Sequence, residues 1–209
     1  MAIQFNAFKA ITSSIPSGGN TLFTTSGTDI FLFIVLYSLA SQGVTGCTYG
    51  GVAMTQIDTV IDGYNNDYRM TTFGLMNAPS GANNISPTFS GGGTISLWGG
   101  SYNGVATVGQ PRTFGKYTSP SANNFPITLI TQTGEWMVAV NRNNSAVTML
   151  SGTTARAGDS NTGLVDSGGI LSPDSNTIGV NCSPLAGGTI MGITLVAPAV
   201  SNKNFLMFL

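Results

Sequence analysis

Histidine is absent from the 209-residue chain, and glutamate occurs once, at Glu135. Histidine is the commonest general base in enzymes, and it accepts the nucleophile's proton in Ser-His-Asp and Cys-His catalysis. The spacing of the remaining acidic residues singles out no pair of carboxylates for glycoside hydrolysis. The sequence therefore predicts a protein that is not an enzyme and has no catalytic residue.

Two short segments with polar side chains are better explained as turns than as sites. Gly158-Asp159-Ser160-Asn161 is similar to the Gly-Asp-Ser block of an esterase family, but the chain has no histidine that could activate Ser160. Asp62, Asn65, Asn66 and Asp67 offer oxygen atoms to a calcium ion, although their spacing is not that of an EF-hand loop. Asn and Asp are also the usual residues of hairpin turns, which we favour here. No metal or cofactor is predicted.

Charged residues are scarce, at 7% of the chain with a net charge of −1. Soluble domains usually carry about a quarter, so this surface repels its neighbours only weakly. Such a composition is tolerable in a protein packed within an assembly, and a secreted β domain fits it equally well. The seven basic residues are scattered from Lys9 to Lys203. Nucleic-acid binding needs clustered Lys and Arg, so no nucleic-acid partner is expected.

No apolar run is long enough to cross a membrane as a helix. The longest strongly apolar stretch, Ile30–Ala40, has 11 residues, whereas a spanning helix needs about 20. The segment Met1–Ser14 lacks the basic start, apolar core and small-residue cleavage site of a secretory signal. We therefore expect no membrane partner, and assembly in a host cytoplasm.

The two cysteines, Cys47 and Cys182, lie far apart and form no CxxC motif. A zinc site would need further Cys or His ligands, which the chain lacks. One disulfide remains an alternative if strands bring the two together. Two buried free thiols are favoured, because a chain of this length buries enough core without a crosslink.

Apolar residues with period 2, separated by Gly, Asn and Ser turns, predict an all-β fold. The expected class is a jelly-roll-like antiparallel β-sandwich in a single domain with short terminal arms. Residues 1–19 form an N-terminal arm or first strand, residues 20–198 the sandwich and residues 199–209 an apolar tail. The expected strands are Asn20–Ser26, Ile30–Ala40, Val44–Tyr49, Val52–Ile61, Tyr68–Met76, Asn84–Phe89, Thr94–Tyr102, Phe125–Gln132, Glu135–Asn141 and Thr189–Val196.

Four local interpretations accompany this assignment. Gly50-Gly51 makes a hairpin turn between its flanking strands. Gly104–Asn124 is the least regular stretch, and Phe125–Gln132 is expected to pair with Glu135–Asn141. In Ile30–Ala40 both faces are apolar, so both must be covered. One face belongs to the sandwich core, and the other is expected to need an arm, a loop or a neighbouring subunit.

Aromatic residues are the strongest candidates for ligand contact. Trp136 shares a strand face with Val138 and Val140, which predicts a core position. Trp98 and Tyr102 flank two glycines, where a surface platform for a sugar is an alternative to burial. The aromatic residues that could stack on sugars are Tyr64, Tyr68, Trp98, Tyr102 and Tyr117.

The segment Val44-Thr45-Gly46-Cys47-Thr48-Tyr49-Gly50-Gly51-Val52-Ala53-Met54-Thr55 resembles a known pattern. Jelly-roll modules of phage virion and bacterial surface proteins carry a V-T-x-x-x-Y-G-G-x-x-[LM]-T block. An apolar strand precedes it, and an N-x-P-x-G turn follows, matched by Asn77–Gly81. A strand with the pattern Gly-[Glu/Asp]-[Leu/Trp]-x-Val comes later, matched by Gly134–Val138. The resemblance covers roughly residues 20–198, implies a jelly roll used for display or binding, and transfers no catalytic residue.

Composition and resemblance together suggest two functions. The first is a non-enzymatic bacteriophage virion protein, a capsid decoration (cement) protein that binds the major capsid protein and copies of itself as a homo-oligomer. The alternative is a receptor- or carbohydrate-binding module of a tail fibre or cell-surface protein, with a glycan as ligand. The candidate subunit interface combines apolar residues of both ends of the chain: Phe5, Phe8, Phe205, Leu206, Phe208 and Leu209.

Deleting Lys203–Leu209 should weaken oligomerisation or particle binding while the sandwich stays folded. Each large apolar side chain buried in such a contact contributes roughly 1.5–3 kcal/mol. Sedimentation velocity measures the oligomer, and circular dichroism measures the fold. If the truncated chain instead unfolds as a monomer, the tail packs on its own sandwich as an edge strand.

Overall fold

The computed structural model describes residues 2–64, 66–106, 110–158 and 162–198, and within these the side chains of residues 11–14 are left aside. Every regular element in this part of the chain is a β-strand, and all strand pairs are antiparallel. The all-β antiparallel prediction is therefore confirmed.

The strands form three sheets. Sheet A has the order β1 (Gln4–Pro16), β9 (Thr94–Asn103), β3 (Phe31–Leu39), β7 (Tyr68–Met76) and β6 (Thr55–Ile61). Sheet B has the order β2 (Thr21–Thr25), β8 (Gly81–Phe89), β4 (Val44–Tyr49) and β5 (Val52–Ala53). Sheet C has the order β10 (Phe114–Thr131), β15 (Asp174–Val196), β11 (Glu135–Asn143), β14 (Thr162–Asp166) and β13 (Thr154–Gly158), and β12 (Val147–Met149) also pairs with β15.

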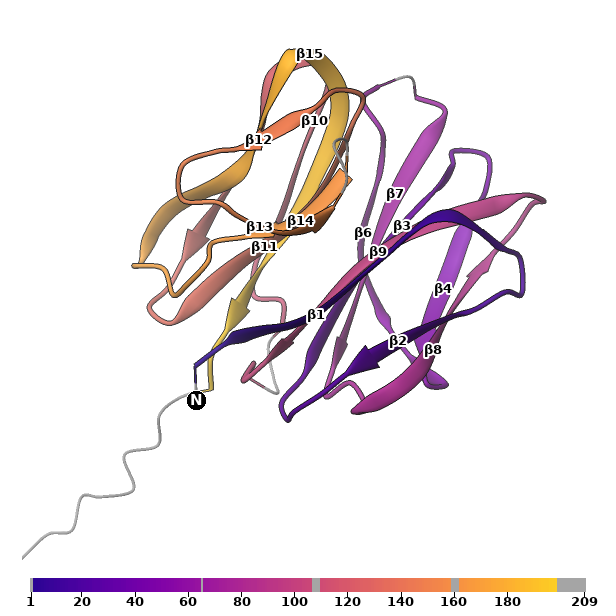
Figure 1. The fold of residues 1–209 in the computed structure, drawn as a ribbon, viewed down its shortest axis with the longest axis horizontal. Helices are drawn as coiled ribbons and strands as arrows, with labels where there is room; N and C mark the ends of the chain where they lie inside the picture. The colour runs from indigo at the N-terminus through magenta and orange to yellow at the C-terminus, as the bar shows by residue number, and fades with distance from the viewer. Residues whose placement is uncertain (1, 65, 107–109, 159–161, 199–209) are drawn as a thin grey trace, which may run out of the picture.

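Sheet A lies between the other two (Figure 1). Its central strand β3 is buried from Phe31 to Ser38, as the apolar run predicts. Ile30, Leu32, Ile34 and Leu36 belong to a core shared with sheet B, which includes Phe23, Tyr49 and Ile85. Phe31, Phe33, Val35 and Tyr37 belong to a core shared with sheet C, which includes Trp136, Val138 and Val140. The expectation that an arm, a loop or another subunit covers the second face is wrong, because a third sheet of the same chain covers it.

Sheet C encloses a third core on its far side. Phe125, Met137, Val180 and Ile190 are among the buried residues of this core. β10 and β15 remain paired from Phe114–Ile193 to Thr131–Asp174, and register shifts near Ala122 bend this pair of strands. Because of the bend, residues from both halves of β15 contribute to the core. Figure 1 shows this bend at the top of the molecule.

The Gly50-Gly51 hairpin forms as expected, with Tyr49 opposite Val52. Both glycines have positive φ, 58° and 81°, the backbone that a two-residue hairpin turn of the I′ type requires. The second strand of this hairpin is shorter than predicted. It ends at Ala53, and Thr55–Ile61 then joins sheet A as β6.

Two expectations about the middle of the chain are wrong. The stretch 104–124, predicted to be irregular, contains the start of β10 at Phe114. Phe125–Gln132 does not pair with Glu135–Asn141, because β15 lies between β10 and β11. β10 is an edge strand whose first half is mostly exposed. An edge strand tolerates proline and needs no apolar alternation, so its sequence resembles a loop.

Gly100 of sheet A lies against Leu164 of sheet C across their shared core. A Cβ atom at this position would lie 2.4 Å from Leu164 Cδ2, and Leu164 is buried. Gly100→Val should therefore lower the free energy of unfolding by about 1–3 kcal/mol through overpacking. Urea titration of Gly100→Val against Gly92→Val measures this, because a Cβ at Gly92 meets nothing within 4 Å. Equal midpoints for the two variants would contradict close packing between the sheets.

Both cysteines are buried free thiols, as favoured from the sequence. Cys47 belongs to the core between sheets A and B, and Cys182 to the core of sheet C. Burial raises the pKa of the Cys47 thiol to about 12 and raises the pKa of Cys182 as well. A buried thiol that stays protonated is a poor nucleophile.

Ellman's reagent at mildly alkaline pH should therefore react with neither thiol in the native protein and with both in guanidinium chloride. Reductant should leave the melting temperature unchanged. Rapid labelling of one cysteine in the native protein would show that the residues packed over that cysteine move apart in the native state.

Candidate functional site

The core between sheets A and C ends in polar and aromatic residues at one edge. Along β11 the side chains that face sheet A are Trp136, Val138, Val140 and then Arg142, because alternate residues of a strand share a face. Along β3 the matching row ends at Tyr37, whose cross-strand neighbours are Met70 and Ser96. The interface is therefore apolar in its middle and becomes polar at this rim.

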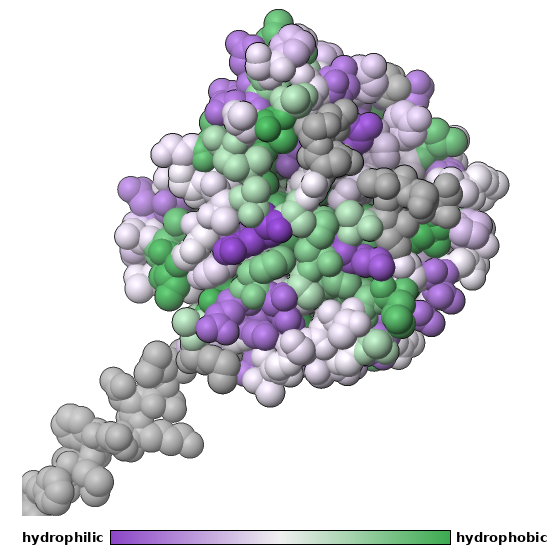
Figure 2. Space-filling view, in the orientation of Figure 1, coloured by the Kyte–Doolittle hydropathy of each residue, from purple (hydrophilic) through white to green (hydrophobic). Residues whose placement is uncertain are grey.

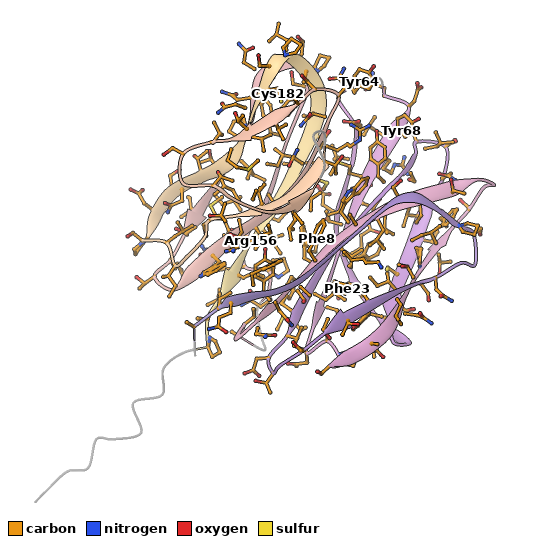
Figure 3. All side chains as sticks on the ribbon, in the orientation of Figure 1. Phe8, Phe23, Tyr64, Tyr68, Arg156 and Cys182 are labelled. Carbon is orange, nitrogen blue, oxygen red and sulfur yellow. The ribbon has the colours of Figure 1, made fainter. Side chains whose placement is uncertain are left out.

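A cleft of about 540 Å³ opens at this rim, and we call it the tyrosine cleft. It lies at the junction of sheets A and C, with walls from β3, the β6–β7 loop, β7, the start of β9 and β11. Tyr64 and Tyr68 lie at this end of the molecule in Figure 3. The residues that line the cleft are Tyr37, Ser38, Leu39, Tyr64, Tyr68, Gly93, Thr94, Ser96 and Arg142.

The aromatic rings of the cleft are held by contacts with each other. Tyr37 stacks on Tyr68, with ring centroids 4.8 Å apart and an interplanar angle of 13°. The edge of Trp98 packs against Tyr37 at 6.0 Å, and the Arg142 guanidinium carbon lies 5.3 Å from the Tyr37 ring centroid. Tyr64 contributes a further ring, and this residue is 47% exposed. The cleft therefore combines fixed rings with one ring open to solvent.

Asp62 anchors the β6–β7 loop that carries Tyr64. Its buried carboxylate accepts hydrogen bonds from the Tyr37 hydroxyl at 2.9 Å and from Thr189 Oγ1 at 3.0 Å. The next residue, Gly63, donates its N–H to Thr189 Oγ1 at 3.2 Å. A Cβ at Gly187 would lie 2.8 Å from the Cα of Tyr64, so the loop sits close to the backbone of β15. These contacts fix Tyr64 against sheet C.

The Tyr37 phenol is held in its protonated state. Burial raises its pKa well above the usual value, and the neighbouring Asp62 carboxylate raises the pKa further. A protonated phenol can donate the hydrogen bond that Asp62 accepts. Asp62 is thus a positioning residue for the cleft rather than part of its open wall.

A second polar cluster joins sheets A and C at the opposite end of their shared core. The buried Asp166 carboxylate accepts hydrogen bonds from Arg156 Nε at 2.6 Å, Tyr102 Oη at 3.1 Å and the Gly168 N–H at 2.7 Å. The Arg156 guanidinium carbon also lies 5.1 Å from the Phe5 ring centroid. Every member is engaged inside the protein, so this cluster is structural.

A smaller hollow of about 280 Å³ lies against sheet C. Asn141 lines it with a buried amide that has no hydrogen-bond partner among the described residues. The other walls include Val147, Met149, Ala157 and Val165 and carry no aromatic ring. The tyrosine cleft is therefore the stronger candidate, because it offers rings, hydroxyl groups and a guanidinium together.

The aromatic residues selected from the sequence lie in different places in the structure. Tyr64 and Tyr68 meet in the cleft, whereas Tyr117 lies on β10 with a 38% exposed ring. Trp98 and Tyr102 are buried in the core between sheets A and C, so neither forms a surface platform. Trp136 is a core residue, as predicted.

The residues selected for a subunit interface are only partly described. Phe5 and Phe8 are half-buried and pack on the core between sheets A and C of their own chain. Phe8 and Arg156 lie on the face where β1 passes beside β13 (Figure 3). The remaining members, Phe205, Leu206, Phe208 and Leu209, lie outside the described residues, as do Asp159, Ser160 and Asn65. The subunit interface stays a prediction.

Sequence reasoning missed Tyr37 and Arg142 as members of a site. The signal that could have found them is the alternation of side chains along a strand. Arg142 follows Trp136, Val138 and Val140 on one face of β11, and Tyr37 ends the facing row of β3, so each places a polar group at the end of an apolar row. Among the described residues, no group of three or more His, Cys, Asp or Glu side chains is placed to hold a metal ion. The same part of the chain has no helix long and apolar enough to cross a membrane.

Comparison with protein-family models, with curated proteins and with solved structures finds no match for this chain.

Asp62→Ala should lower the free energy of unfolding by about 2–3 kcal/mol, because the hydroxyl groups of Tyr37 and Thr189 lose a buried acceptor. Chemical denaturation measures the loss. Asp174→Ala is the matched control, since Asp174 is exposed and, among the described residues, its side chain accepts only from the adjacent Ser175 N–H. If both variants unfold at the same denaturant concentration, Asp62 does not anchor the loop.

Proposed function

We propose that this protein is a non-enzymatic carbohydrate-binding module displayed on a virus particle or cell surface. The observation that carries this proposal is the tyrosine cleft, in which aromatic rings, hydroxyl groups and a guanidinium converge on one hollow. Pockets that bind small molecules combine apolar or aromatic walls with a few placed polar groups. A sugar has the matching surface, with C–H groups on its ring faces and hydroxyl groups around its rim.

The strand order of sheets A and B supports this class of protein. With β6 set aside, sheet A reads β1-β9-β3-β7 and sheet B reads β2-β8-β4-β5. If these eight strands are counted in chain order, the two sheets are 1-8-3-6 and 2-7-4-5, which is the order of a jelly roll. Jelly rolls occur in viral capsid and lectin domains. A fold does not define a function, so the cleft remains the main support.

Tyr64 is the residue best placed to stack on a sugar ring. Tyr37 and Tyr68 already stack on each other, whereas Tyr64 is about half exposed and is held at the cleft by its loop. Tyrosine presents an apolar face and a polar hydroxyl, which suits a ligand that is partly apolar and partly wet. Thr94 and Ser96 place hydroxyl groups on the β9 wall of the same cleft.

A capsid decoration protein that binds the major capsid protein and copies of itself is the second candidate. Its support is the outer surface, where large apolar side chains are exposed at Ile130, Leu185, Ile170 and Leu22. Figure 2 shows strongly hydrophilic residues only in small separate groups on the face in view. The second apolar face of β3 gives this candidate no support, because sheet C of the same chain covers that face. Carbohydrate binding is therefore the better supported function.

A glycan array with neutral and acidic oligosaccharides tests the proposal. The wild-type protein should bind a defined subset of glycans. Tyr64→Ala should weaken that binding about tenfold, which corresponds to roughly 1.4 kcal/mol for a lost stacking contact. Tyr117→Ala removes an exposed tyrosine outside the cleft and should change the affinity little. No glycan bound by the wild type, or equal losses in the two variants, would contradict the proposal.

A further inference from the structure

Arg142 places a positive charge in the tyrosine cleft. It is the only Lys or Arg among the described residues that line the cleft, and no Asp or Glu lines it. In the described part of the chain the ion pairs join Arg112 to Glu135, Lys116 to Asp58 and Arg156 to Asp166. Arg142 takes part in none of them. No carboxylate of the described residues therefore forms an ion pair with the guanidinium of the cleft.

Two contacts hold this guanidinium at the cleft. One of its N–H groups donates to the carbonyl oxygen of Asn143, and its carbon lies 5.3 Å from the Tyr37 ring centroid. A guanidinium has five N–H donors in a planar fork, so further donors remain for a ligand. Because the group is already ordered, a ligand that binds it loses less conformational entropy.

The Asp62 carboxylate near the cleft already has partners inside the protein. Asp62 is 1% exposed, and its oxygens accept from Tyr37 and Thr189. It is not among the residues that line the cleft. Asp67, on the same loop, is exposed and is likewise absent from the lining. An anion that enters the cleft therefore meets Arg142 without an intervening acidic side chain.

We infer that the tyrosine cleft selects an acidic sugar, with the sugar carboxylate bound by the Arg142 guanidinium and the sugar ring on Tyr64. The inference rests on the proposed carbohydrate-binding function and names its ligand class as uronic or sialic acids. Planar carboxylates and guanidinium groups form paired N–H···O bonds that are stronger than neutral hydrogen bonds. A neutral sugar in the same position leaves those donors with water alone.

Titration calorimetry with matched probes tests this inference. The probes are sialyllactose against lactose, and an oligogalacturonate against its methyl ester, which keeps the ring and removes the charge. The wild-type protein should bind at least one acidic probe about tenfold or more tightly than its neutral partner. The acidic affinity should also fall as salt is raised.

Two substitutions at Arg142 and one control identify the cause. Arg142→Gln should remove the preference for the acidic probe, so that the acidic probe and its neutral partner bind with affinities within about twofold of each other. Arg142→Lys, which keeps the charge without the planar fork, should retain part of the preference. Arg69→Gln removes the same charge from the neighbouring β7 outside the cleft lining and should leave the preference intact. Circular dichroism confirms that each variant is folded.

The outcomes separate this inference from the proposed function. If neutral and acidic probes bind equally, or if Arg142→Gln weakens both equally, the acidic preference is wrong while carbohydrate binding stands. If Arg142→Gln does not fold, the other two variants decide. An unchanged preference in Arg142→Lys, or a loss of preference in Arg69→Gln, then overturns the inference in the same way. If no probe and no glycan on the array binds, the proposed function fails as well.

Discussion

The two apolar faces of β3 are the constraint on which the rest of the structure depends. A strand that is apolar on both faces must be covered on both, because leaving either in water forfeits roughly 25 cal/mol for each Å² of apolar surface. Sheet B covers one face and sheet C covers the other, so sheet A becomes the middle layer of three. The second half of the chain therefore completes the core that the first half begins.

The junction of sheets A and C has a polar cluster at each end. At one end Arg156 and Tyr102 share the buried Asp166 carboxylate, and every polar partner is internal. At the other end Asp62 is satisfied by Tyr37 and Thr189, while Arg142 and Tyr64 keep donors and ring surface for a ligand. The same packing of two sheets thus makes a closed structural end and an open end with a cleft, which is the proposed binding end. The difference is that Arg156 forms an ion pair with Asp166, whereas Arg142 takes part in none of the ion pairs among the described residues.

Sequence patterns predict the elements of this fold better than their pairing. The continuous apolar run locates β3, and strand patterning locates β7 and β9, nearly to the residue. The row Trp136, Val138, Val140 is correctly assigned to the core. The start of β10 is lost because an exposed edge strand needs no alternation. Its partner β15 begins only at Asp174, so the pairing depends on long-range contacts that local patterns do not encode. The tyrosine cleft is missed for the same reason, because its walls come from β3, β7, β9 and β11.

Amide chemical-shift mapping by NMR, on isotopically labelled wild-type protein titrated with sialyllactose and with lactose, tests the central claim most directly. The claim is that the open end of the sheet A–sheet C junction is where this protein binds carbohydrate. The account predicts saturable shifts concentrated at the amides of Tyr37, Tyr64, Tyr68, Ser96 and Arg142 with at least one of the two sugars. Shifts confined to the hollow beside Asn141 or to the exposed apolar residues, or no saturable shifts with either sugar, would contradict it.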